Sequence, residues 1–326
     1  MSATTKHCIL CNGELGEIVF SNLIDRLGML PGTWDFVRCK NCESLVLDPM
    51  PSDEELLSAY PAVYSADQAP QTHPLHRWLH QLETKMFYEP MYRASTRQVL
   101  QMTGLKSGKM LDVGGGTGKR TVYFKKAGFD AWVLEPEEQP LQIAREMFGL
   151  NTICNTLDAA ELPKESFDLI TFFAVIEHLP NPAATLEITK SLLRPGGWLV
   201  LLAPISNSLQ RRIFGLRWHE AREAPRHVTL PTSTGMQSLL ARNGFNLKAS
   251  ESDIVINRAG VMALSLVYDA KSDIACATTK VSSRVFNRVL GGIAMISCIP
   301  LAFVESLLKS PSIGVFAAQK PFHTSA

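Results

Sequence analysis

The chain has 326 residues, enough for one large domain and a smaller one, and 46% of them are hydrophobic, which excludes a disordered chain. A formal net charge of +1 provides no excess of positive charge for nucleic acid, so we expect no nucleic-acid partner. The short basic run at Gln210–Arg212 is interpreted as solvated surface. The first ten residues lack the apolar core of a signal peptide, which predicts a cytoplasmic protein.

Two Cys-x-x-Cys pairs stand at the beginning of the chain, formed by Cys8, Cys11, Cys39 and Cys42. In a reducing compartment this spacing indicates four thiolates around one tetrahedral zinc ion. Four sulfur ligands leave no open coordination position, so the zinc is expected to be structural. Four free thiols, or a redox-active pair built from one of the motifs, are the alternatives.

Three segments are predicted: a zinc ribbon at 1–48, a connector with helices at 49–104, and an α/β domain at 105–326. The connector is rich in proline near its start, and apolar residues from Leu75 to Gln101 follow helical spacing.

From Lys109 onward, short apolar runs alternate with helical stretches. This order predicts a doubly wound, mostly parallel sheet with helices on both faces. The predicted strands are Met110–Val113, Ala131–Glu135, Thr152–Leu157, Phe167–Phe173 and Trp198–Ala203.

A glycine-rich turn follows the first of these strands, with Gly114, Gly116 and Gly118 as G-x-G-x-G after Asp112. The spacing differs from the G-x-G-x-x-G of dinucleotide-binding proteins. It also differs from a phosphate-binding P-loop, because Arg120 follows Lys119 in place of serine or threonine. A turn that only reverses the chain is the plain alternative.

Acidic residues follow the next two strands. Glu135 ends the second strand, where a carboxylate can accept hydrogen bonds from both ribose hydroxyls, and Asp158 is placed to contact an adenine edge. Together with "LDVGGGTG", "FDLITFFAVIEHL" and "LLRPGGWLVLLAP", these motifs resemble the class I S-adenosylmethionine-dependent methyltransferases. The resemblance covers roughly Leu105 to Gly244 and implies a Rossmann-like fold with a seven-stranded sheet.

The resemblance also implies roles for individual residues. The three glycines would admit the methionine part of S-adenosylmethionine, and Asp112 would steady the loop and the cofactor's amino group. Glu135 would hold the ribose, and Asp158 with Ala159 would border the adenine. Phe173 and Ala174 would lie beside the sulfonium.

The ribbon and connector extend the resemblance to a bacterial subgroup associated with sugars, surface polysaccharides and other small metabolites. This implies a small-molecule, sugar or lipid-linked acceptor.

Candidate acceptor residues lie after the fourth and fifth strands. His219 and His227 belong to an irregular stretch, and His178 follows the fourth strand. A histidine here can remove the proton of an acceptor hydroxyl, and Arg226 beside His227 is expected to bind an anionic part of the acceptor. The alternative is that these side chains, with Glu177, serve only as scaffolding.

A hydrophobic insertion is predicted at about 256–310, before a last strand at Ser312–Lys320. The run from Val289 to Val304 carries no charge but is interrupted by Pro300. Because the chain must return to the same sheet, we expect a helical hairpin and not a membrane span. Packing on the domain, dimerisation and peripheral membrane contact remain open.

Two other classes of function are weighed against a methyltransferase. A nicotinamide-dinucleotide oxidoreductase predicts a different glycine spacing. A non-catalytic protein that only holds the cofactor would show no methyl transfer.

Overall fold

A seven-stranded sheet in the order β10-β11-β8-β7-β4-β5-β6 forms the centre of the structure, a computed structural model that describes residues 7–58, 74–267 and 281–322. All its neighbouring strands are parallel except β11, which is antiparallel to β8 and β10. The predicted doubly wound, mostly parallel sheet is therefore confirmed. Its strands are β4 (Gly108–Val113), β5 (Phe129–Glu135), β6 (Asn151–Cys154), β7 (Phe167–Phe173), β8 (Leu193–Pro204), β10 (Asn246–Ser252) and β11 (Ile313–Gln319).

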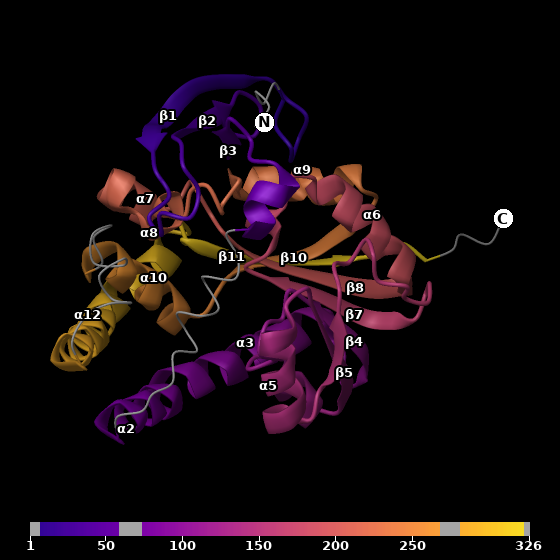
Figure 1. The fold of residues 1–326 in the computed structure, drawn as a ribbon. Helices are drawn as coiled ribbons and strands as arrows, with labels where there is room; N and C mark the ends of the chain where they lie inside the picture. Colours follow the sequence, from indigo (N-terminus) through magenta and orange to yellow (C-terminus); the bar gives the residue numbers. More distant parts are fainter. Residues whose placement is uncertain (1–6, 59–73, 268–280, 323–326) are drawn as a thin grey trace.

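Helices cover both faces of this sheet (Figure 1). Along β8, Leu199 and Leu201 pack toward α6 and α9, whereas Val200 and Leu202 pack toward α3 and α5, as the alternation of a strand buried on both faces requires. The helices of the two layers and their links are α2 (Pro74–Glu83), a π-helical turn (Thr84–Tyr88), α3 (Glu89–Thr103), α4 (Thr121–Lys126), α5 (Glu138–Phe148), a 3₁₀ turn (Ile176–His178), α6 (Pro182–Leu192) and α9 (Ser233–Arg242).

The predicted strand Thr152–Leu157 is wrong at its end, because β6 stops at Cys154. The side chain of Asn155 donates to the carbonyl of Ala159 at 3.1 Å, which closes a turn where the strand would have continued. Asp158 and Ala159 consequently lie in an exposed turn beyond the sheet.

The N-terminal residues form a second, four-stranded antiparallel sheet in the order β1-β2-β3-β9. Strands β1 (Leu15–Leu23), β2 (Trp34–Cys39) and β3 (Leu45–Asp48) come from the ribbon, but β9 (Thr229–Leu230) comes from the segment after β8. That segment also holds α7 (Leu209–Phe214), a 3₁₀ turn (Gly215–Arg217) and α8 (His219–Arg222). The β3–β9 pairing crosses the predicted boundary at residue 48, so the division into 1–48, 49–104 and 105–326 stays a prediction.

An aromatic core joins the ribbon to the larger domain. Trp218 is fully buried and packs in one cluster with Phe20, Trp34 and Phe36 of the ribbon. At the other end of the ribbon, the Thr232 hydroxyl donates to the carbonyl of Cys42. These contacts fix the ribbon above the sheet (Figure 1).

The insertion before β11 forms a pair of packed helices, α10 (Val255–Val267) and α12 (Val281–Leu307). Its residues 268–280, like 59–73 of the predicted connector, lie outside the described residues. Arg258 and Glu305, both buried, pair at 3.3 Å and hold the bases of the two helices against the domain. The stretch Val289–Leu307 is long and apolar enough to cross a membrane, with mean hydropathy 1.8, yet the chain returns directly to the sheet as β11.

We predict that Trp218→Ala lowers the free energy of unfolding by about 3–5 kcal/mol, because it removes a fully buried indole at the ribbon–domain joint and leaves a cavity. Trp78→Ala is the control, since this indole is 57% exposed and its loss should cost roughly 0.5 kcal/mol or less. Urea titration measures both. Equal decreases in the free energy of unfolding for the two variants would contradict the role of Trp218 in joining the ribbon to the domain.

Candidate active site and metal centre

The glycine loop between β4 and α4 has a backbone that only glycine adopts easily. Gly114 has φ +67°, and a Cβ there would lie 2.7 Å from Cγ2 of Val175. Gly116 and Gly118 also have positive φ, at 52° and 72°. The loop thus leaves bare backbone at the carboxyl end of β4, where ligands of parallel sheets bind.

The buried side chain of Asp112 stabilises this loop. Its carboxylate is buried and accepts hydrogen bonds from the Thr171 hydroxyl at 2.7 Å and the Thr121 hydroxyl at 2.5 Å. Burial raises the pKa of Asp112, and the two hydroxyl donors oppose that rise. These bonds join β4, β7 and the start of α4, so Asp112 is placed to steady the loop. Its contact with a cofactor amino group stays a prediction.

Glu135 lies at the end of β5, next to the glycine loop. Its Oε2 accepts a hydrogen bond from the backbone N–H of Gly116 at 3.1 Å. The structure therefore brings together the acidic residue and the glycines that the sequence separates. Asp158 and Ala159 lie in the turn after the neighbouring strand β6.

Phe173 and Ala174 lie at the carboxyl end of β7, across from the loop. Ala174 is exposed and has a positive φ of 57°. The Arg120 guanidinium carbon lies 4.3 Å from the centre of the Phe173 ring, and Arg120 also donates to the hydroxyl of Ser95. Sequence reasoning used Arg120 only to exclude a P-loop, and its position directly after the glycine loop was the one signal available.

Two of the three candidate histidines meet. The rings of His178 and His227 are 4.6 Å apart at their centres, and each Nδ1 lies 3.0 Å from a backbone carbonyl, of Arg226 and of Glu220 respectively. Burial lowers the pKa of both rings, that of His178 to about 4. Both imidazoles are therefore neutral near pH 7. His219 stands apart from this pair, half-buried, with Nε2 3.6 Å from Glu223.

Glu177 adds a buried carboxyl group to the histidine pair. Its Oε2 has no hydrogen-bond partner among the described residues, and burial raises the pKa of Glu177 to about 8. Glu177, His178 and His227 each offer a ligand atom, and these atoms lie within 4.8 Å of one another. Two imidazoles and one carboxylate are a donor set that divalent transition metals accept. Sequence reasoning left Glu177 as possible scaffolding because burial cannot be read from the motif.

The expectation that Arg226 binds an anionic acceptor is wrong. Its guanidinium is buried and pairs with Asp25 of the ribbon at 2.6 Å and with Glu223 at 3.3 Å. The two carboxylates accept hydrogen bonds from the guanidinium N–H groups that an anionic methyl acceptor would need. Arg226 instead ties the loop between β1 and β2 to the segment before β9.

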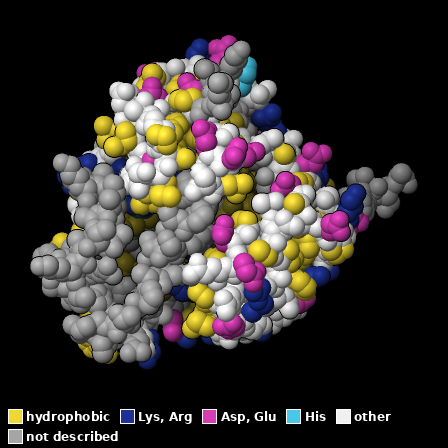
Figure 2. Space-filling view, viewed as in Figure 1, with side chains coloured by type: hydrophobic (Ala, Val, Ile, Leu, Met, Phe, Trp, Pro, Cys, Tyr) yellow, Lys and Arg dark blue, Asp and Glu magenta, His cyan; other side chains and the backbone are white. Residues whose placement is uncertain are grey.

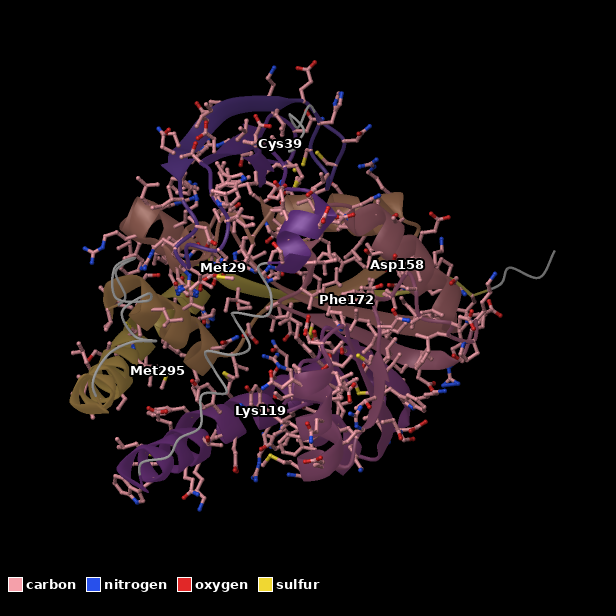
Figure 3. The ribbon with its side chains drawn as sticks, viewed as in Figure 1. Met29, Cys39, Lys119, Asp158, Phe172 and Met295 are labelled. Atoms are coloured by element: carbon pink, nitrogen blue, oxygen red, sulfur yellow. The ribbon has the colours of Figure 1, made fainter. Side chains whose placement is uncertain are left out.

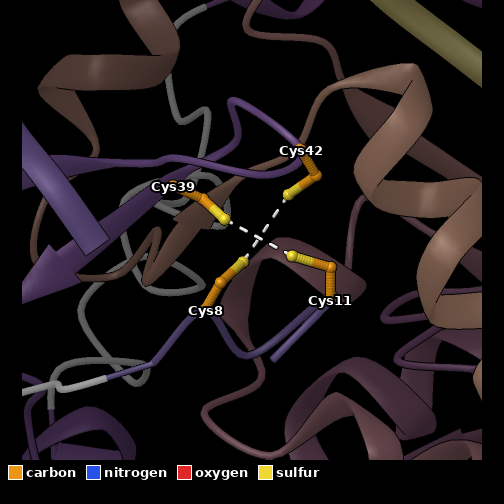
Figure 4. Close-up of side chains that lie close together, drawn as sticks. All are labelled: Cys8, Cys11, Cys39 and Cys42. Carbon is orange, nitrogen blue, oxygen red and sulfur yellow. Dashed lines mark hydrogen bonds between the residues drawn. The ribbon is translucent and has the colours of Figure 1, made fainter. Parts of the chain in front are cut away.

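The four ribbon cysteines converge on one point (Figure 4). The Cys8 and Cys42 sulfur atoms are 3.7 Å apart, and those of Cys11 and Cys39 are 3.3 Å apart. These separations are too long for disulfides. They are near the edge of roughly 3.8 Å that a tetrahedron with Zn–S bonds of about 2.3 Å would have. The donor set and geometry thus fit a closed four-thiolate site.

The strand order and the glycine loop define a Rossmann-like methyltransferase fold. The profile of a protein family described as "Methyltransferase domain" matches residues 77–250. This span exceeds half of the chain, so the chain belongs to that family.

Individual relatives match parts of the chain. The ubiquinone biosynthesis O-methyltransferase of Hydrogenovibrio crunogenus is 29% identical over 108 residues, 31% of this chain and 44% of that protein. The protein of the same name from Pseudomonas aeruginosa is 25% identical over 150 residues, 43% of this chain and 63% of that protein. The chain thus spans about half the length of the curated relatives it matches.

Among solved structures, the 1,6-didemethyltoxoflavin-N1-methyltransferase of Burkholderia thailandensis, with bound S-adenosylhomocysteine, is similar at 15% identity. The similarity covers 86% of this chain and 96% of that one, with a TM-score of 0.49.

Proposed function

We propose that this protein transfers a methyl group from S-adenosylmethionine to a small-molecule acceptor. The observation that carries the proposal is the contact of Glu135 with the backbone of Gly116, which sets an acidic side chain beside bare loop backbone. Membership of the methyltransferase-domain family supports it. The glycine spacing and the family membership both disfavour the nicotinamide-dependent alternative.

The proposed cofactor-binding residues lie at or after the carboxyl ends of β5, β6 and β7. The carboxylate of Glu135 would accept from the ribose hydroxyls, and the Asp158–Ala159 turn would border the adenine. Phe173 and Ala174 would shape the side on which the acceptor approaches. When bound, S-adenosylmethionine supplies a methyl carbon made electrophilic by the sulfonium. The remaining task of the protein is to align the acceptor and exclude water.

The histidine pair is the best placed base for an acceptor hydroxyl. A base needs a lone pair at working pH, which burial preserves on both rings by keeping them neutral, while the lowered pKa makes each ring a weaker base than a free imidazole. His227, whose Nδ1 is oriented by the Glu220 carbonyl, is the residue we assign, with His178 beside it. The relatives named above are O-methyltransferases by name, which favours a hydroxyl acceptor. Sugar and lipid-linked acceptors belong to the same proposal.

A second candidate use of this cluster is cation binding. The Oε2 of Glu177, for which the described part of the chain offers no hydrogen-bond partner, favours it, because a divalent ion would compensate the charge of the buried carboxylate. Dialysis against a chelator tests this use. Loss of turnover, restored by one divalent metal without change in ribbon zinc, would support it.

We also propose that the four cysteines of the ribbon hold a structural zinc ion.

We further propose a cytoplasmic location with peripheral membrane contact through α12. Ile293, Phe303 and Leu307 of this helix are 57%, 57% and 68% exposed, which is unusual for large apolar side chains in one helix. Figure 3 shows Met295 of α12 far from Cys39 of the ribbon, so the proposed zinc site and the proposed membrane contact lie in separate parts of the molecule.

The first prediction from this proposed function concerns the cofactor. Glu135→Ala should weaken S-adenosylmethionine binding by about 1.5–3 kcal/mol, the usual value of hydrogen bonds to a charged group. Glu138→Ala is the matched control, because Glu138 is an exposed carboxylate three residues away. Titration calorimetry on both variants decides the assignment. Unchanged affinity of Glu135→Ala for S-adenosylmethionine would show that Glu135 does not bind the cofactor.

The second prediction concerns the base. His227→Ala should slow turnover roughly 10²–10⁴-fold while cofactor affinity is kept, whereas His219→Ala should have little effect. A base acts when deprotonated, and a lowered pKa keeps His178 and His227 deprotonated in weak acid. Turnover should therefore persist below pH 6.5, where an unshifted histidine would become protonated and lose activity. Full turnover in all three histidine-to-alanine variants would exclude this mechanism.

The third prediction concerns the ribbon metal. Protein purified without chelator should contain about one zinc ion per chain, as expected for a closed four-thiolate site. Cys39→Ser should lower both the zinc content and the melting temperature, whereas Cys154→Ser, at an exposed cysteine outside the cluster, should change neither. Finding no metal, or iron, would contradict the assignment.

A further inference from the structure

A polar pocket lies where the ribbon meets the segment after β8. It has a volume of about 200 Å³ and is lined by Arg38, Glu43, Ser206, Asn207, Arg211 and Arg212. Arg38 belongs to ribbon strand β2, and the last four residues follow the carboxyl end of β8. The run Gln210–Arg212, which the sequence presents as solvated surface, therefore contributes two cations to a built cavity.

Positive charge predominates in this pocket. Three guanidinium groups face one carboxylate, that of the exposed Glu43. Arg38 has a partner in Glu17 at 3.1 Å, but neither Arg211 nor Arg212 forms an ion pair within the part of the chain described. Burial, and then the charges of Arg38 and Arg212, lower the pKa of Arg211. The cations thus repel one another, and an anion between them would relieve the repulsion.

Ser206 supplies a second, independent sign of a ligand. The residue is 2% exposed, and its hydroxyl has no hydrogen-bond partner among the described residues. Its backbone groups are already paired, the N–H with the Pro231 carbonyl at 2.7 Å and the carbonyl with Nε of Arg211. The hydroxyl is thus the one polar group of Ser206 without a partner among the described residues, and Ser206 lines the pocket. A buried hydroxyl without a partner is uncommon, and a bound ligand, ion or water would supply the partner.

We propose that this pocket binds a phosphate or pyrophosphate group carried by the methyl acceptor. Arginine guanidinium groups match phosphate oxygens with two parallel hydrogen bonds, and the Ser206 hydroxyl would donate one more. The lining residues carry three positive charges and one negative charge, and Glu17 outside the lining pairs with Arg38, so the remaining excess of positive charge favours an anion such as phosphate. The backbone N–H of Ser206 in the pocket donates to the carbonyl of Pro231, directly after β9, and His227 lies two residues before β9. A phosphate held here would therefore anchor an acceptor that extends along β9 toward the candidate base. This last step rests on the proposed function.

Binding is tested with inorganic phosphate and inorganic pyrophosphate by titration calorimetry on the full chain. Arg212→Gln should weaken pyrophosphate binding at least tenfold, and Ser206→Ala should weaken it by a smaller factor. Arg217→Gln is the matched control, because this exposed arginine lies in the next turn but does not line the pocket. Unchanged melting temperature in Arg212→Gln and Arg217→Gln verifies folding. Absence of pyrophosphate binding, or equal weakening in both arginine variants, would overturn the site.

A second arm distinguishes a free ion from a phosphorylated acceptor. Cell extract is treated with phosphatase, the phosphatase is removed, and transfer of labelled methyl groups is measured. The proposal predicts loss of labelled product after treatment, and a raised KM with kcat kept for Arg212→Gln on untreated extract. Product formation unchanged by phosphatase would overturn the link to the acceptor. No methyl transfer at all, with pyrophosphate binding intact, would count against the proposed function and not against the pocket.

Discussion

The backbone of Val228 connects the sheet, the ribbon and the candidate base, and the rest of the site depends on this connection. Its N–H donates to the carbonyl of Glu177 after β7, and its carbonyl accepts from the N–H of Leu47 in β3, both at 2.9 Å. Strand β9 follows at once and completes the ribbon sheet. His227 is thereby held against His178, and the segment that carries it is tied to the ribbon.

Buried ion pairs also hold the ribbon to the segment before β9, and they occupy an arginine that a ligand would otherwise contact. Arg226 is buried against Asp25 and Glu223, and Arg26 also pairs with Glu223. An ion pair taken out of water is costly unless each charge keeps its partner, so it fixes the ribbon loop in one position. Arg226 therefore cannot serve the acceptor. Arg211 and Arg212 of the pocket beside Ser206 remain available to a ligand. On the face that Figure 2 shows, Lys and Arg side chains are interspersed with Asp and Glu.

The sheet was predictable because apolar runs with strand length alternate with helical periods, and β7 was predicted with its observed bounds. The glycine loop and Glu135 were predictable because they lie at strand ends, which a parallel sheet brings to one edge. Strand β9 was missed because two residues carry no periodic signal. The role of Arg226 was misjudged because its partner Asp25 lies 201 residues away in the sequence. The burial of Glu177 likewise depends on tertiary contacts.

The measurement that tests the account most directly is transfer of a labelled methyl group from S-adenosylmethionine to fractionated cell extract. Wild-type protein and Glu135→Ala are compared at a cofactor concentration that saturates only the former. The account predicts one labelled small-molecule product with wild-type protein and a large decrease with the variant. Binding of S-adenosylmethionine without labelled product in any fraction would contradict it, and would identify the chain as a cofactor-holding protein without catalysis.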